Sequence, residues 1–125
     1  MKKIFLDTNF LMSIMQFKID IFSEIDRIID ETYTILVLDK TIQELEEIIK
    51  TQKTKEKKAA QFALKAVRIK NISVYETKEN KDVDDILAGL SRDNNVIIAT
   101  LDKDLKKRLE GKMMVIRQKK FVELI

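Results

Sequence analysis

Four acidic residues stand where chemistry explains them better than packing. They are Asp7, Glu44, Asp84 and Asp102. The first and the last directly follow short apolar runs, and the other two fall in the first turns of segments with helical hydrophobic spacing. A buried strand has no use for a carboxylate, so we expect these acids at the sheet edge where parallel strands end.

The composition restricts what such acids can do. The chain has 125 residues with no His and no Cys, which excludes catalytic triads with histidine, histidine general bases and thiolate or imidazole metal sites. Crowded carboxylates repel one another unless a cation neutralises them. The cation expected for an all-oxygen ligand set is Mg²⁺ or Mn²⁺. Such an ion can activate a water and neutralise charge on a phosphodiester.

Each acid also has a purely structural explanation. Asp7 could cap the helix that follows it, and Glu44 could complete a capping box with Thr41. Helix first turns favour acids through the helix dipole, which covers Asp84, Asp85, Asp102 and Asp104. Capping accounts well for any one of these residues but poorly for four that converge on one edge.

Hydrophobic periodicity divides the chain into alternating strands and helices. Strands are expected at residues 4–6, 34–38, 72–75, 96–100 and 113–116. Helices are expected after residue 10, over 17–31, after 39, after 59, after 83 and after 102, with loops at 51–58 and 76–81. Residues 118–125 carry no clear pattern and are left unassigned.

This alternation predicts an α/β fold, a three-layer α/β/α sandwich with a mostly parallel central sheet of about five strands. Right-handed crossovers would bring the strand-to-helix turns, and with them the acids, to one edge. We expect a single domain spanning residues 1–125. No apolar run approaches the roughly 20 residues of a membrane span, and none fits a signal peptide, so a cytoplasmic location is expected.

The net charge of +3 conceals an uneven distribution. Residues 50–70 carry +7 and residues 103–120 carry +6, which leaves −10 for the remainder. Basic segments beside an acidic site suggest RNA as a polyanionic partner, although solvated helix faces are the commoner explanation for one such run. The candidate RNA-binding residues are Lys53, Lys55, Lys57, Lys58, Lys103, Lys106, Lys107 and Arg108.

Four motifs together resemble those of PIN-domain ribonucleases, in the right order and over nearly the whole chain. They are Leu6-Asp7-Thr8-Asn9, Thr41-Ile42-Gln43-Glu44-Leu45, Val83-Asp84-Asp85-Ile86-Leu87-Ala88 and Ala99-Thr100-Leu101-Asp102-Lys103-Asp104-Leu105. The resemblance implies an α/β/α sandwich and an endoribonuclease dependent on Mg²⁺ or Mn²⁺. It assigns catalysis and metal binding to Asp7, Glu44, Asp84 and Asp102.

The same resemblance gives supporting roles to neighbouring residues, namely Thr8, Asn9, Asp85, Thr100 and Asp104. The acid pair 84–85 and the basic run 103–108 look more like the archaeal and eukaryotic rRNA-processing branch of the family. The toxin branch also fits this length, and would imply an antitoxin partner in place of a ribosome-assembly partner.

Alternatives outside catalysis remain open from sequence alone. A PIN-like RNA-binding or scaffold module would use the basic segments and leave the acids idle. Phosphoaspartyl proteins fit poorly, because a dehalogenase-type phosphatase needs a second Asp where Asn9 stands, and a receiver domain needs an acceptor Asp after the third strand. A homodimer is a further possibility, with the apolar residues of the tail as contacts.

Overall fold

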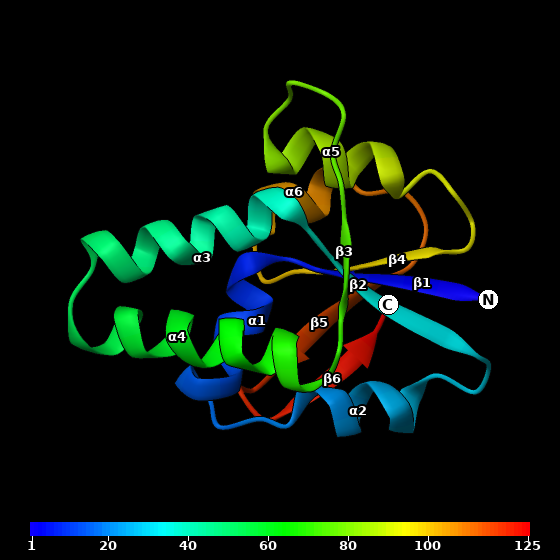
Figure 1. Ribbon diagram of the computed structural model, residues 1–125. Coiled ribbons are helices and arrows are strands. Elements are labelled where there is room, and N and C mark those ends of the chain that lie inside the picture. The colour runs from blue at the N-terminus through cyan, green and yellow to red at the C-terminus, as the bar shows by residue number, and fades with distance from the viewer.

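The computed structural model describes all 125 residues and consists of strands alternating with helices (Figure 1). The strands are β1 (Lys2–Leu6), β2 (Tyr33–Leu38), β3 (Ser73–Tyr75), β4 (Val96–Ala99), β5 (Met113–Arg117) and β6 (Phe121–Leu124). The helices are α1 (Thr8–Gln16), α2 (Ile21–Ile28), α3 (Asp39–Thr51), α4 (Thr54–Ile69), α5 (Val83–Leu90) and α6 (Lys103–Arg108). None of these helices is long and apolar enough to cross a bilayer.

All six strands belong to one sheet, in the order β3-β2-β1-β4-β5-β6. The pairs from β3 to β5 are parallel, and β6 pairs antiparallel with β5. The predicted α/β architecture with a mostly parallel sheet is confirmed, with six strands where about five were expected. The extra strand is the unassigned tail.

The turn into β6 explains why the tail was not recognised from sequence. Gln118 and Lys119 both adopt left-handed backbone conformations, with φ of 55° and 54°. Gly, Asn and Asp adopt such conformations most readily, and these are the residues that indicate a hairpin in a sequence. A hairpin formed by Gln and Lys therefore gives no local signal.

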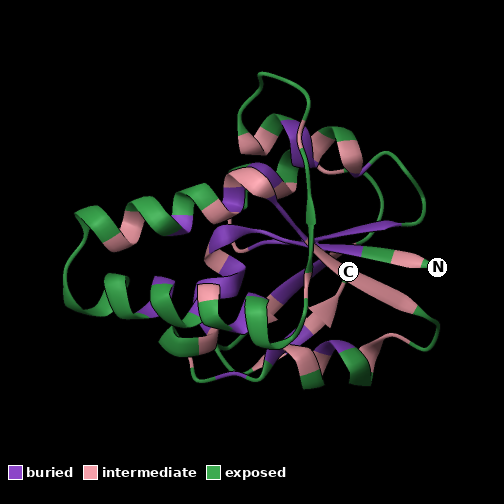
Figure 2. Ribbon diagram, viewed as in Figure 1, coloured by how far each residue is buried: buried purple, intermediate pink, exposed green.

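The central strands are buried on both faces, and successive side chains enter different layers. Ile4 and Leu6 belong to the larger apolar cluster, which α1, α2, α3 and α4 complete, whereas Phe5 belongs to a smaller cluster formed with α5 and α6. Figure 2 shows β4 buried along its length and β3 exposed at the sheet edge. This alternation builds the predicted three layers.

Two predicted element boundaries are wrong. The helix expected over residues 17–31 begins only at Ile21, because Asp20 caps it by accepting hydrogen bonds from the amides of Phe22 and Ser23. The loop expected at 51–58 is only two residues long, Gln52 and Lys53, and the charged run after it already forms the start of α4. α3 and α4 consequently lie side by side as one long hairpin (Figure 1).

The sheet has a switch point between β1 and β4. The chain leaves β1 for the layer of α1 and leaves β4 for the opposite layer of α6. Connections that diverge to opposite faces leave a crevice at the carboxyl ends of the two strands, the usual position of a site in such sheets. Asp7 and the segment after Ala99 lie at these ends.

Candidate active site

Asp7 is a buried carboxylate at the switch point, only 7% exposed. It is the N-cap of α1, and its Oδ1 accepts a hydrogen bond of 2.9 Å from the amide of Thr8. Its Oδ2 accepts a hydrogen bond of 2.7 Å from the Thr100 hydroxyl. Capping thus accounts for Oδ1 of Asp7. Its Oδ2 binds a residue 93 positions further along the chain instead.

Thr100 connects the ends of β1 and β4. The strand register pairs Leu6 with Ala99, so the next residues, Asp7 and Thr100, are brought side by side. The fully buried Thr100 hydroxyl also accepts a hydrogen bond of 3.1 Å from the amide of Asp102. One hydroxyl therefore fixes both the Asp7 carboxylate and the backbone that carries Asp102.

Asp102 is the N-cap of α6. Its Oδ1 accepts from the amides of Asp104 and Leu105 at 2.9 and 3.2 Å. As with Asp7, a capping role and a place at the switch point coexist in one side chain.

Glu44 does not form the capping box that its sequence suggested. α3 begins at Asp39, three residues earlier than the capping box requires, so Thr41 is already inside the helix. The Thr41 hydroxyl is buried without a hydrogen-bond partner. Glu44 turns instead to α1, where its Oε2 accepts a hydrogen bond of 3.3 Å from the Thr8 hydroxyl.

Asp84 lies in the first turn of α5 but does not cap it. The cap is Asp82, whose Oδ1 accepts from the amide of Asp85 at 2.9 Å. The spacing Asp82-x-x-Asp85 is a capping signal that sequence reasoning could have used. The side chain of Asp84 therefore makes no capping hydrogen bond, and the only structural role left to it is the interaction of a first-turn acid with the helix dipole.

A hollow of about 690 Å³ lies between the first turns of α3 and α5. It is lined by Lys40, Gln43, Glu44, Glu47, Asp82, Val83 and Asp84. Two of the four candidate acids, from separate helices, therefore face one solvent-filled space. Sequence reasoning did not single out Lys40, which lines the same space.

Burial raises the pKa of Asp7 above its ordinary value, and repulsion from Asp102 acts in the same direction. The hydrogen bonds from Thr100 and Thr8 oppose this rise because they stabilise the charged form. The carboxylate is therefore held in a place where its negative charge is unfavourable.

The pKa values of Glu44 and Asp84 are also raised. Glu44 is exposed as a whole residue, but its carboxyl group is partly desolvated and lies near the charges of Asp7 and Asp84, and both effects raise its pKa. For Asp84, desolvation is again the first cause, followed by repulsion from Asp7 and Asp102. The four acids thus act on one another electrostatically although they come from four elements.

These acids fit a hard divalent cation held partly through water. No three acidic side chains are close enough together to bind one ion directly. Mg²⁺ usually retains several waters and binds proteins through one or two carboxylates. A divalent charge would also relieve the repulsion that raises the three pKa values.

Of the supporting residues, Thr8, Asn9 and Thr100 contact the site. The Asn9 side-chain oxygen accepts from the amide of Leu101 at 3.3 Å and so ties α1 to the segment before Asp102. Asp85 does not turn to the site, because it pairs with Arg108 on α6. Asp104 is exposed, and only its backbone amide contacts another acid of the group.

The basic residues divide into two groups by distance from the acids. Lys103, Lys106, Lys107 and Arg108 belong to α6, whose first turn Asp102 caps. Residues 53–58 lie at the turn between α3 and α4, at the end of the hairpin remote from α5 and α6 (Figure 1). Only the first group adjoins the acidic site.

The model of the PIN like domain family matches residues 4–119. The chain is 38% identical over 129 residues to Ribonuclease VapC4 of Methanocaldococcus jannaschii, covering 99% of this chain and 97% of the relative. The solved structure of the PIN domain endonuclease Utp24 superimposes with a TM-score of 0.77 at 21% identity, over 98% of this chain and 90% of that one. At that identity the structural likeness shows the shared fold.

Asp7→Asn is expected to raise the free energy of unfolding at neutral pH in metal-free buffer, because a buried acid with a raised pKa destabilises the folded state when ionised. The gain over wild type should be full above the raised pKa and should shrink as the pH falls towards the ordinary value of 3.8. Urea unfolding with a chelator, at a series of pH values, measures this difference. Asp30→Asn, at an exposed position, is the control. A less stable Asp7→Asn protein at neutral pH would show that the hydrogen bonds outweigh the cost of burial.

Thr100→Val is expected to destabilise the protein by about 1–3 kcal/mol, because it leaves Oδ2 of Asp7 without a donor and the Asp102 amide without an acceptor. Thr100→Ser keeps the hydroxyl and should lose much less. Chemical denaturation at neutral pH gives both values. Equal losses in the two variants would mean that the methyl group of Thr100, rather than its hydroxyl, stabilises this part of the fold.

Proposed function

The chain belongs to the PIN-like domain family, and from that premise we propose that it is an endoribonuclease that hydrolyses RNA phosphodiester bonds with Mg²⁺ or Mn²⁺. The observation that carries the proposal is the convergence of four mutually repelling acids at the switch point of the sheet. The ribonuclease name of the relative at 38% identity supports it. Ribonucleases of this family generally use divalent metal ions.

In this proposal Asp7, Glu44, Asp84 and Asp102 hold the metal, directly or through its waters. The bound metal supplies an activated water and charge neutralisation at the phosphate that is cut. The protein supplies orientation: Thr100 fixes Asp7, and Thr8 on α1 fixes Glu44. With no histidine in the chain, carboxylates or lysines are left to accept and deliver protons.

RNA would approach along α6. The pKa of Lys106 is lowered, first by partial burial and then by repulsion from Arg117 and Lys103. Cations that repel one another in this way gain stability when a phosphate lies between them. Arg108 is paired with Asp85, so it would have to exchange this carboxylate for a phosphate. The lysines at the tip of the α3–α4 hairpin would contact RNA remote from the cut bond.

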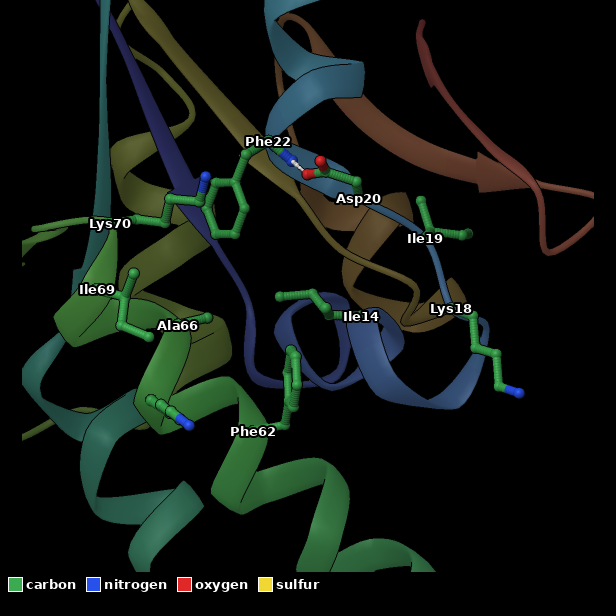
Figure 3. Close-up of a pocket in the computed structure, with 10 residues that line it drawn as sticks. Ile14, Lys18, Ile19, Asp20, Phe22, Phe62, Ala66, Ile69 and Lys70 are labelled. Carbon is green, nitrogen blue, oxygen red and sulfur yellow. Dashed lines mark hydrogen bonds between the residues drawn. The ribbon is translucent and has the colours of Figure 1, made fainter.

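The acid pair 84–85 and the basic run 103–108 favour a role in rRNA processing, as they did from sequence. A toxin-type ribonuclease, with a protein partner that controls it, is the second candidate because one surface of the chain suits a protein. This surface is an apolar groove of about 480 Å³ between α4 and the segment that joins α1 to α2 (Figure 3).

The groove combines exposed apolar side chains with a basic rim. Phe62 and Ile69 of α4 are 43% and 69% exposed beside it. Its rim carries Lys18, Lys65 and Lys70. The one acid there, Asp20, is occupied with capping α2. The partner that complements this surface is a helix with an apolar stripe flanked by Asp and Glu, as an antitoxin segment could provide.

Mn²⁺ is expected to raise the thermal melting midpoint of the wild type, because a ligand that binds only the folded state stabilises it by RT ln(1 + [L]/Kd). Asp7→Asn and Glu44→Gln should lose this shift and cut RNA more than about 100-fold more slowly, since loss of even an outer-shell partner costs about 10- to 100-fold. A fluorescent single-stranded RNA reports cleavage. Asp30→Asn is again the matched control.

The outcomes separate the candidate functions. RNA binding without metal binding or cleavage in the wild type would favour the scaffold module and reject the enzyme. Full activity in Glu44→Gln would remove this residue from the metal site and leave it the hydrogen bond to Thr8 alone.

A synthetic helical peptide with a leucine stripe flanked by glutamates is expected to bind the groove. The double variant Phe62→Ser/Ile69→Ser should bind this peptide at least about tenfold more weakly, because two apolar contacts that become buried on binding contribute more than about 1.4 kcal/mol. Fluorescence anisotropy measures both affinities. The same peptide with lysines in place of glutamates is the control. Equal binding of the two peptides would reject the basic rim as a determinant, and self-association of the chain through the groove would indicate a second copy as its occupant.

A further inference from the structure

Asp84 differs from the other candidate acids in how the fold fixes its position. Asp7 directly follows β1, the Asp102 amide is bound by the Thr100 hydroxyl just after β4, and Glu44 is tied to α1 by the Thr8 hydroxyl. Asp84 instead follows the exposed, charged segment 76–81 between β3 and α5. Something must hold this segment if Asp84 is to keep its place opposite Glu44.

Lys40, in the first turn of α3, binds the end of that segment. Its Nζ donates hydrogen bonds to the backbone carbonyls of Glu79, at 3.4 Å, and of Lys81. An ammonium group has three donors and can serve two carbonyls at once. The carbonyl of Lys81 belongs to the peptide bond with Asp82, the N-cap of α5, so this contact is one residue away from the helix that carries Asp84.

Asp39, the residue before Lys40, binds the start of the same segment. Its Oδ1 accepts a hydrogen bond of 2.8 Å from the Thr77 hydroxyl, and its Oδ2 accepts one of 3.2 Å from the Thr77 amide. Two consecutive residues of α3 therefore hold both ends of the segment. We call this pair of contacts the loop clamp.

The loop clamp and the acidic site share one helix. Glu44 lies little more than one turn beyond Lys40 on α3, and Lys40 lines the hollow together with Glu44 and Asp84. Because α3 carries Glu44 and also binds the backbone that leads to Asp84, it sets the separation of the two acids across the hollow.

The rest of α5 does not depend on the clamp. Ile86 and Leu87 are buried in the smaller apolar cluster, and Asp85 pairs with Arg108. Removing the Lys40 ammonium should consequently leave α5 folded against the sheet while its first turn gains freedom.

We propose that Lys40 is a positioning residue for Asp84, which it holds opposite Glu44 by binding the backbone carbonyls at the end of the 76–81 segment. The link to catalysis rests on the proposed ribonuclease function. The link to the position of α5 does not, and can be measured without any activity.

The test compares Lys40→Met with Lys78→Met. Both variants remove one positive charge at this side of the molecule, and the exposed side chain of Lys78 makes none of the clamp contacts. Backbone hydrogen exchange of residues 76–86 and the amide NMR signals of Asp84 and Asp85 report the local structure. RNA cleavage, as kcat and KM separately, reports the catalytic consequence.

In the Lys40→Met variant, the backbone amides of residues 76–85 are expected to exchange hydrogen faster and the Asp84 amide signal to shift. Its melting midpoint should stay close to that of Lys78→Met. Its kcat should fall by about 10- to 100-fold, the usual effect of losing a residue that orients a metal ligand, while KM stays near that of Lys78→Met. Asp39→Asn, which weakens the other half of the clamp, should show the same pattern with a smaller amplitude.

The proposal is overturned if the two Lys→Met variants exchange alike, or if exchange rises in Lys40→Met while kcat remains equal to that of Lys78→Met. A rise in KM alone would make Lys40 an RNA contact instead. If the wild type itself cuts no RNA with Mg²⁺ or Mn²⁺, the ribonuclease proposal fails, and the exchange and NMR comparison still decides whether Lys40 fixes the start of α5.

Discussion

The site depends on the cost of burying the Asp7 carboxylate at the junction of β1 and β4. An unpaired buried charge is strongly unfavourable, and proteins compensate for it with hydrogen bonds or a bound cation. Here the Thr8 amide and the Thr100 hydroxyl provide two hydrogen bonds, yet the pKa of Asp7 stays raised. The two hydrogen bonds therefore do not fully offset the cost of burying the charge. A cation bound at this point would remove the remaining cost, which would add to its binding free energy.

The strand register makes this arrangement possible. Because Leu6 pairs with Ala99, Thr100 comes level with Asp7, and its hydroxyl also fixes the amide of Asp102. A shift of one position in β4 would turn Thr100 to the other face of the sheet and remove its contact with Asp7. The apolar side chains that set the register in the two core clusters therefore also set the geometry of the site.

The order of strands and helices and the convergence of the four candidate acids could be predicted from sequence, because they follow from periodicity and from polar residues placed near strand ends. The partners of those acids could not. Thr41 and Glu44 have the spacing of a capping box, but α3 starts earlier and Glu44 binds Thr8, which lies 36 positions away. Likewise β6 follows a turn without a sequence signal, and the loop clamp joins residues about 40 positions apart. Each of these features is decided by tertiary packing, which local pattern does not contain.

A site built from several acids also needs tertiary contacts that hold the acids in place. Carboxylates that raise one another's pKa values also push one another apart, so the protein without metal would tend to open where its backbone is held least firmly. Asp7 directly follows the core strand β1, Asp102 follows β4 with its amide bound by Thr100, and Glu44 sits on a helix of 13 residues. The least supported member is Asp84, at the end of an exposed segment, and it is there that Asp39 and Lys40 bind the backbone. A hydrogen bond from a lysine to backbone carbonyls suits this task, because it adds a positive charge beside the acids without occupying their oxygens, which remain available to a metal ion.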